Sequence, residues 1–319
     1  MNPNTALVTG GNSGIGFECA RQLARDGWHV VIASRNRDAS AHAADQIRAE
    51  AGADSVSAMA LDLGSLASVR AFISAVEQKD LPLRALVCNA GVPASGERKL
   101  SPDGFETTFA VNHLGHFLLT NLLLARLAAH APARIVVVAS GVHDPALTTG
   151  MPNPAIADLE TLAQYGGPSE AGFDGRLAYV NSKLCNLWFV YELDRRLRAA
   201  GAHVTVNGYD PGLVPGSGLA REYPSALRFV WDHVLPPITG LLSSVVPMLS
   251  TAPRSGVALA RLVSDPSFED TSGKYFPSHS RWQEARSSVD SYDARRAAEL
   301  WKLSMRLSGL PAGASLAAP

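Results

Sequence analysis

The chain has 319 residues and a formal net charge of −1, with 18% charged residues of both signs. This near-neutral, mixed charge argues against a nucleic-acid-binding surface or a polybasic membrane anchor, so the expected partners are small molecules. The length suits one large α/β domain with a substantial buried core.

Short apolar segments rich in β-branched residues alternate with helical segments along the chain. The predicted strands are Ala6–Val8, His29–Ala33, Ser57–Leu61, Leu86–Cys88, Arg134–Ala139 and Val204–Gly208. A helix is predicted from about Ile15 to Asp26, directly after a glycine-rich turn. This alternation predicts an α/β fold, a Rossmann-type doubly wound parallel sheet with crossover helices.

The sequence predicts a single domain over residues 1–310, because no internal repeat or linker divides it. An insertion is expected at about 141–178, between the fifth strand and the next helix. The last residues, 311–319, have the small-residue and proline composition of a disordered tail.

An uncharged run, residues 234–253, is as long as a membrane span. Pro236, Pro237 and Gly240 interrupt it, so an unbroken helix is not expected. We predict broken apolar helices in a lid at about 213–253 that covers a hydrophobic substrate site, and no transmembrane segment. Peripheral membrane contact is the alternative.

The compartment is predicted from cysteine usage and from the N-terminus. The three cysteines have neither metal-ligand nor disulfide spacing, and each is expected to be a small buried apolar residue. The segment Met1-Asn2-Pro3-Asn4 lacks the basic and apolar regions of a signal peptide. We therefore expect a cytoplasmic protein.

A glycine-rich loop, Thr9 to Gly16, follows the first predicted strand. Its glycines permit a tight turn, close approach of the backbone to a pyrophosphate, and close packing of helix on sheet; the helix N-terminus then faces the phosphates. Its place between a first strand and a first helix indicates dinucleotide binding. The predicted binding residues are Gly10, Asn12, Ser13, Gly14, Ile15 and Gly16.

Arg35 follows the second predicted strand, where an NAD-specific enzyme usually carries an acidic residue. A guanidinium at this place can pair with a 2′-phosphate, so the sequence favours NADP(H) over NAD as the cofactor. The alternative interpretation is a solvated loop arginine.

Tyr179 and Lys183 are four residues apart in a predicted helix. Residues i and i+4 share one helix face, so the Lys183 ammonium can reach toward the Tyr179 phenol. A nearby cation lowers the pKa of a phenol, ordinarily about 10, by favouring the phenolate. The pair is a candidate proton donor and acceptor for interconversion of a carbonyl and an alcohol.

Seven motifs occur in order along the chain. They are Thr9-Gly10-x-x-x-Gly14-x-Gly16, Asp62 after the third strand, Asn89-Ala90-Gly91 after the fourth, Asn112, Ser140 after the fifth, Tyr179-x-x-x-Lys183, and Pro211-Gly212 after the sixth. Together they resemble the short-chain dehydrogenases/reductases over residues 5 to about 275. The cofactor-binding residues implied by this resemblance are Asp62 and Leu63 near the adenine, Asn89, Ala90 and Gly91 at the ribose and central sheet, and Pro211, Gly212 and Val214 beside the nicotinamide.

The resemblance also implies four catalytic residues, Asn112, Ser140, Tyr179 and Lys183. Ser140 would donate a hydrogen bond to the substrate oxygen, and Tyr179 would transfer the proton. Lys183 would bind the nicotinamide ribose, and Asn112 would position a water that connects Lys183 to solvent. The alternatives are that Asn112 satisfies backbone groups of its own helix and that Asp62 is a helix cap.

Two segments, Val111–Thr120 and Ser182–Asn186, look like the branch that holds retinol dehydrogenases and light-dependent protochlorophyllide reductases. The C-terminal region looks closest to the latter in residues 262–267, 272–275 and 300–304. The chain departs from the plant and cyanobacterial enzymes at Leu213, where they usually carry a cysteine implicated at the pigment site.

Three functional hypotheses follow. The first is an NADP(H)-dependent oxidoreductase that transfers hydride to or from a bulky apolar carbonyl or alcohol. The alternative is light-dependent protochlorophyllide reduction with NADPH. The remote alternative is a non-catalytic NADP(H)-binding sensor, which the complete set of catalytic residues disfavours. The resemblance allows a monomer or a homo-oligomer.

Overall fold

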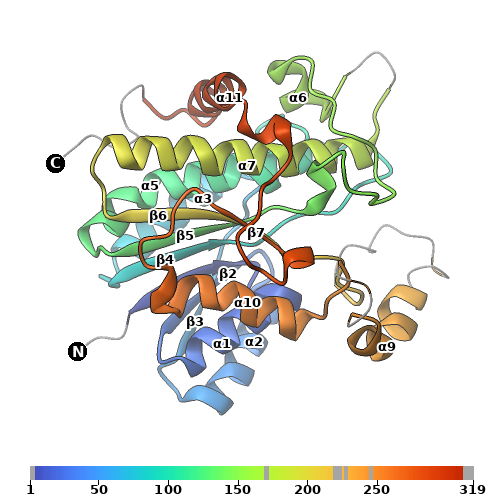
Figure 1. The fold of residues 1–319 in the computed structure, drawn as a ribbon. Coiled ribbons are helices and arrows are strands. Elements are labelled where there is room, and N and C mark those ends of the chain that lie inside the picture. Colours follow the sequence, from blue (N-terminus) through green and yellow to red (C-terminus); the bar gives the residue numbers. More distant parts are fainter. Residues whose placement is uncertain are drawn as a thin grey trace.

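The fold is that of a computed structural model, which describes residues 4–168, 172–217, 225, 229–243, 246 and 248–311. Seven parallel strands form one sheet in the order β3-β2-β1-β4-β5-β6-β7, with helices on both faces (Figure 1). The predicted Rossmann-type doubly wound sheet is confirmed. The strand order reverses between β1 and β4, and ligands bind such sheets beyond the carboxyl ends of the strands at that point.

All six predicted strands are present, with ends that differ by up to three residues from the predicted ones. The strands are β1 Thr5–Thr9, β2 His29–Ser34, β3 Val56–Ala60, β4 Leu83–Cys88, β5 Ala133–Val138, β6 Val204–Asp210 and β7 Tyr275–Pro277. The sequence did not predict β7, because three residues are too few for an alternating pattern. It pairs with the end of β6.

Side-chain alternation along the strands divides the core between the two faces of the sheet. Ala6 and Val8 of β1 belong to one apolar cluster, whereas Leu7 belongs to the other. The main helices that cover the first face are α1 Gly14–Arg25, α2 Arg37–Ala51 and α10 Ala252–Ser264 (Figure 1). Those that cover the second face are α3 Leu66–Glu77, α5 Gly115–Ala129 and α7 Gly175–Ala199.

Helix α7 is buried along most of its length because a further helix, α11 (Ala294–Leu307), packs on its outer side (Figure 1). The Trp301 ring of α11 lies 4.9 Å from the Phe117 ring and 5.9 Å from the Phe189 ring, between centroids. The Arg196 guanidinium of α7 lies 4.4 Å from the centre of the same indole. These contacts fix α7 against the sheet and so fix the residues that it carries.

The predicted insertion contains α6 (Leu159–Tyr165) and is tied to α7 by Asn181. The Asn181 side chain donates to the carbonyls of Gly166 at 2.8 Å and Ala155 at 3.1 Å. The short helices elsewhere are α4 Thr107–Phe109, the π-helices η1 Ala110–Leu114 and η4 Val230–Val234, and the 3-10 helices η2 Gly141–His143, η5 Pro266–Phe268, η6 Ser278–Ser280 and η7 Val289–Tyr292.

In the predicted lid, α9 (Leu235–Leu242) continues from η4 and stands apart from the other helices (Figure 1). Pro236 and Pro237 lie in its first turn. Within the described residues, no helix is both long and apolar enough to cross a membrane. The predicted tail lies outside the described residues from position 312 on.

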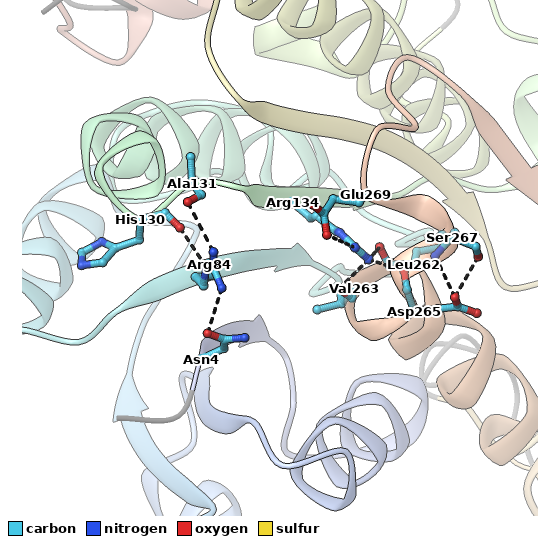
Figure 2. A network of polar contacts seen from close by, with 10 residues as sticks. All are labelled: Asn4, Arg84, His130, Ala131, Arg134, Leu262, Val263, Asp265, Ser267 and Glu269. Atoms are coloured by element: carbon cyan, nitrogen blue, oxygen red, sulfur yellow. Dashed lines mark hydrogen bonds and ion pairs between the residues drawn. The ribbon is translucent and has the colours of Figure 1, made fainter. Parts of the chain in front are cut away.

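Two arginines stabilise the sheet at the amino-terminal ends of β4 and β5 (Figure 2). The buried Arg134 guanidinium donates to the carbonyls of Val263 at 2.8 Å and Asp265 at 2.7 Å, where α10 ends. These are carbonyls that the helix leaves without an internal partner. Arg84 donates in the same way to His130 at 2.9 Å. This end of the sheet is therefore structural, and the opposite end is left for ligands.

Candidate active site

A cavity of about 530 Å³ opens at the carboxyl ends of the strands. Most predicted site residues line it: Gly10, Asn12, Ser13, Gly14, Ile15, Gly16, Arg35, Asp62, Leu63, Asn89, Ala90, Gly91, Ser140, Tyr179, Lys183, Pro211 and Gly212. The other two predicted residues, Asn112 and Val214, are fully buried and lie outside this lining. The structure thus brings residues from positions 10 to 212 around one cavity.

The glycine-rich loop needs its glycines for two different reasons. Gly10 and Gly14 have φ angles of 65° and 56°, in the left-handed region that favours glycine. Gly16 has no room for a side chain, since a Cβ would lie 2.4 Å from both the Gly10 carbonyl oxygen and the Asn89 amide nitrogen. Conformation at two positions and close packing at the third shape the loop.

The loop is joined to β4 and α5 through the Thr9 hydroxyl, which the sequence did not single out. Its oxygen accepts the backbone N–H groups of Asn89 at 2.9 Å and Ala90 at 3.0 Å. His116 Nδ1 lies 3.2 Å from the Asn112 carbonyl and must donate to it, so its Nε2 accepts from Thr9 at 2.9 Å. Burial lowers the pKa of His116 to about 4, which keeps the ring neutral in this bridge.

Asn112 lies in the π-helix η1 and supports the cavity wall from beneath. Its side chain accepts the Val92 N–H at 2.8 Å and donates to the Val92 carbonyl at 3.2 Å and the Ser182 hydroxyl at 3.0 Å. The idea that it satisfies its own helix is therefore wrong. π-Helical turns recur at functional sites, and here the turn directs an amide toward a neighbouring loop.

Asp62 is not a helix cap, because Ser65 takes the N-cap position of α3. The Asp62 carboxylate accepts the Gly64 N–H at 2.9 Å instead and lines the cavity. At the end of β2, Arg35 is exposed at the cavity, and Asn36 caps α2 by accepting the Ala39 N–H at 3.0 Å. The cap fixes the turn that carries Arg35.

The Lys183 ammonium is buried and donates to the Val138 carbonyl, at the end of β5, at 3.2 Å. It lies 5.5 Å from the centre of the Tyr179 ring. Burial lowers the pKa of Lys183 to about 8, and the negative charge of Asp210 opposes that shift. Lys183 therefore loses its proton more readily than a solvated lysine does.

Ser140 lies two residues beyond the end of β5 in an extended conformation, and His143 anchors its carbonyl with a hydrogen bond of 2.6 Å. The structure thus adds His143 and Asp210 to the residues that the sequence had indicated. An acidic residue in front of Pro211-Gly212, at the end of an apolar strand, was the available signal for Asp210.

The three cysteines, Cys19, Cys88 and Cys185, are free and buried, as predicted. Burial raises the pKa of each thiol. Cys185 packs among apolar side chains of α6, α7 and α11 and not in the cavity, although it is only two residues from Lys183.

Comparison with known proteins identifies the family. The sequence profile described as short chain dehydrogenase matches residues 4–150. The WW domain-containing oxidoreductase of Danio rerio is 36% identical over 96% of this chain and 69% of its own length. The polyprenol dehydrogenase of Danio rerio is 35% identical over 97% of this chain and 88% of its own length. Protochlorophyllide reductase B of Oryza sativa subsp. japonica is 35% identical over 97% of this chain and 78% of its own length.

The chain is a short-chain dehydrogenase/reductase. The predicted family, its oxidoreductase class and the likeness to protochlorophyllide reductases are confirmed. The crystal structure of an uncharacterized protein from Mycobacterium paratuberculosis has the same fold, with a TM-score of 0.68 and 31% identity. That similarity covers 96% of this short-chain dehydrogenase/reductase and 93% of the other chain.

The cavity of this short-chain dehydrogenase/reductase fits a nicotinamide dinucleotide. Ser13 is the N-cap of α1 and makes no side-chain capping bond, so the first N–H groups of the helix are available to a pyrophosphate. Arg35 lies at one part of the lining, and Tyr179 and Lys183 lie at another. One extended molecule can therefore contact the arginine, the glycine loop and the tyrosine together.

Replacing Gly16 by alanine is expected to weaken NADPH binding at least about tenfold and to destabilise the fold by about 1–3 kcal/mol, because the new Cβ overpacks the Gly10 carbonyl. Fluorescence titration with NADPH and thermal unfolding measure the two effects. Gly96→Ala is the matched control, since a Cβ there meets nothing within 4 Å. Unchanged affinity in a folded Gly16→Ala protein would contradict this role of the close contact.

Proposed function

We propose that this short-chain oxidoreductase uses NADP(H) to transfer hydride to or from a bulky apolar carbonyl or alcohol. One observation carries the proposal: Ser140, Tyr179 and Lys183 line the same cavity as the glycine loop and Arg35. Proton-transfer groups and dinucleotide-binding groups thus face a shared space. A protein that only binds the cofactor has no need of the former.

Each catalytic side chain has a role that follows from its position. The Tyr179 hydroxyl gives its proton to the substrate oxygen in reduction and takes it back in oxidation. The Ser140 hydroxyl donates a hydrogen bond to that oxygen as negative charge develops on it. The Lys183 ammonium, 5.5 Å from the Tyr179 ring, favours the phenolate. When bound, NADP(H) supplies or accepts the hydride.

Asn112 acts as a positioning residue in this mechanism. It connects the Gly91–Val92 loop to Ser182, whose hydroxyl donates to the Tyr179 carbonyl at 2.7 Å. A side chain on Gly91 would lie 3.2 Å from the Asn112 amide oxygen and 4.0 Å from the Lys183 ammonium. Asn112 therefore fixes the spacing between the loop and the helix that carries the catalytic pair.

The apolar substrate is supported by the surface of the predicted lid. Among the described residues, most of the exposed large apolar side chains lie between positions 213 and 246, including Leu213, Ile238 and Leu242. The Trp231 indole donates to the carbonyl of Ser217, a cavity-lining residue, at 3.2 Å. Two relatives are named for polyprenol and protochlorophyllide, both large and apolar.

We place this activity in the cytoplasm, because Cys19, Cys88 and Cys185 are free thiols, as a reducing compartment maintains them. Contact of the lid with a membrane surface and assembly into homo-oligomers are both compatible with the proposal.

Tyr179→Phe is expected to reduce turnover by at least about 10³-fold, because the variant has no proton to give and general acid–base catalysis alone contributes on the order of 10²–10⁴. NADPH affinity is expected to stay within about threefold of the wild-type value. Spectrophotometric assays at 340 nm and fluorescence titration measure the two quantities. Undiminished turnover would refute the mechanism.

Arg35→Ala is expected to lower kcat/KM for NADPH by about 10- to 100-fold, the range for a lost charge-assisted hydrogen bond, and to leave kcat/KM for NADH nearly unchanged. Arg37→Ala is the matched control, since Arg37 is also exposed but lies outside the cavity lining. Equal losses with both cofactors would contradict a 2′-phosphate contact.

Protochlorophyllide reduction is the second candidate, favoured by 35% identity over 97% of the chain. Two assays separate the two functions. One supplies a polyprenol with NADP⁺, and the other supplies protochlorophyllide with NADPH under illumination. We expect alcohol-dependent NADPH formation and no chlorophyllide, because Leu213 stands where the pigment enzymes usually carry cysteine. Light-dependent chlorophyllide formation would reverse this preference.

A further inference from the structure

Asp210 is a buried carboxylate, with 4% of its surface exposed, at the last position of β6. Its Oδ1 accepts the Gly212 N–H at 2.9 Å, and its Oδ2 accepts the Tyr275 hydroxyl at 3.4 Å. Gly141 packs against the same carboxylate, since a Cβ on Gly141 would lie 3.2 Å from its Oδ2. One side chain thus connects the residue after Ser140, the loop beside the predicted nicotinamide position, and β7.

The same carboxylate shares the carboxyl-terminal edge of the sheet with the ammonium of Lys183. Lys183 donates to the Val138 carbonyl, and Val138 is paired in the sheet with Tyr209, the residue before Asp210. The two charges therefore lie at the ends of neighbouring strands. A buried cation favours its neutral form unless an opposite charge is near, and Asp210 is the charge that acts in this direction on Lys183.

The groups that face Asp210 leave it as the negative partner. His143 accepts the Ser288 N–H at 3.1 Å on Nε2 and donates from Nδ1 to Ser140, so its ring is neutral, and burial lowers its pKa. Burial also raises the pKa of the Tyr209 and Tyr275 phenols, which remain protonated.

His279, which is half-buried, is the remaining titratable neighbour of Asp210. Burial raises the pKa of Asp210 above its usual value, and the hydrogen bond from the Gly212 N–H opposes that shift. Both hydrogen bonds to its oxygens come from donors, which is the environment of an ionised carboxylate.

We propose that Asp210 is the counter-charge of the Lys183 ammonium, and that it also positions the Pro211-Gly212 loop through a backbone hydrogen bond and the Ser140 loop through its contact with Gly141. This inference rests on the proposed function, because it assigns to Asp210 the electrostatic control of the proton transfer by Tyr179. Asp210 acts through Lys183 and is a positioning residue, not a group that touches substrate.

The decisive test is the ionisation of Tyr179 in the full chain without substrate. Phenolate absorbance at 295 nm is measured against pH in the wild-type and Asp210→Asn proteins. The absorbance of the same protein carrying Tyr179→Phe is subtracted from each, which leaves the titration of Tyr179. Removing a negative charge by itself favours the phenolate and lowers the midpoint. If Asp210 keeps Lys183 charged, loss of the Asp210 carboxylate makes Lys183 neutral. The midpoint of the Tyr179 titration then rises by at least about one pH unit.

A double-mutant cycle identifies the path of this effect. In a Lys183→Met background, Asp210→Asn is expected not to raise the midpoint. A rise of equal size there, or an unchanged or lower midpoint in Asp210→Asn alone, would overturn the proposal. Asp210→Ser provides a second charge-removing variant should the asparagine variant not fold, as checked by circular dichroism.

Kinetics separate this inference from the proposed function. At pH 7, turnover of Asp210→Asn is expected to fall at least about tenfold, with the acidic limb of the kcat profile moved to higher pH and KM for NADPH changed less than about threefold. If the wild-type protein turns over no carbonyl or alcohol but the midpoint still rises in Asp210→Asn, the proposed function fails and the role of Asp210 holds.

Discussion

The ammonium of Lys183 is buried at the end of β5, bonded to the Val138 carbonyl, and much of the structure follows from keeping it there. Burying a charge is costly, so α7 has to be held firmly against the sheet. The Trp301 contacts of α11 and the hydrogen bonds of Asn181 to the insertion supply that support on two sides. Elements far apart in the sequence therefore support the helix that carries Tyr179 and Lys183.

The cofactor side of the cavity depends on close backbone approach instead of charge. Gly16 brings α1 against the Gly10 carbonyl, and the Thr9 hydroxyl receives the N–H groups of the neighbouring strand end. His116 adds α5 to the same assembly as a neutral bridge. Since these are short-range contacts between rigid elements, the dinucleotide meets a site that is already formed.

In the proposed function, substrate choice depends on another part of the molecule. Two relatives are named for different substrates, although both resemble this chain over nearly its whole length. The proposed proton-transfer residues lie just beyond β5 and on α7, whereas many of the exposed apolar side chains lie on η4 and α9, beyond the end of β6. Separate elements thus carry reaction type and specificity, so one can vary without the other.

The sequence by itself determined the α/β order, the glycine loop, the Tyr179 and Lys183 pair, and the family. Local periodicity and turn chemistry decide the first three features, so the residues that reveal each of them are close together in the chain. The family followed from the resemblance of seven motifs spread along the chain. It did not reveal β7, which has only three residues. Nor did it show that Asn112 supports a neighbouring loop and not its own helix.

Tertiary structure alone decided which groups Thr9, His116, His143 and Asp210 contact. Thr9 opens the glycine-loop motif and Asp210 precedes Pro211-Gly212, but neither place in the sequence shows the contacts of the side chain. Its role depends on which strand lies beside which: Asp210 is near Lys183 only because β6 pairs with β5. Strand neighbours are set by packing of the whole chain, and the electrostatics of the active site therefore emerge only when the sheet is assembled.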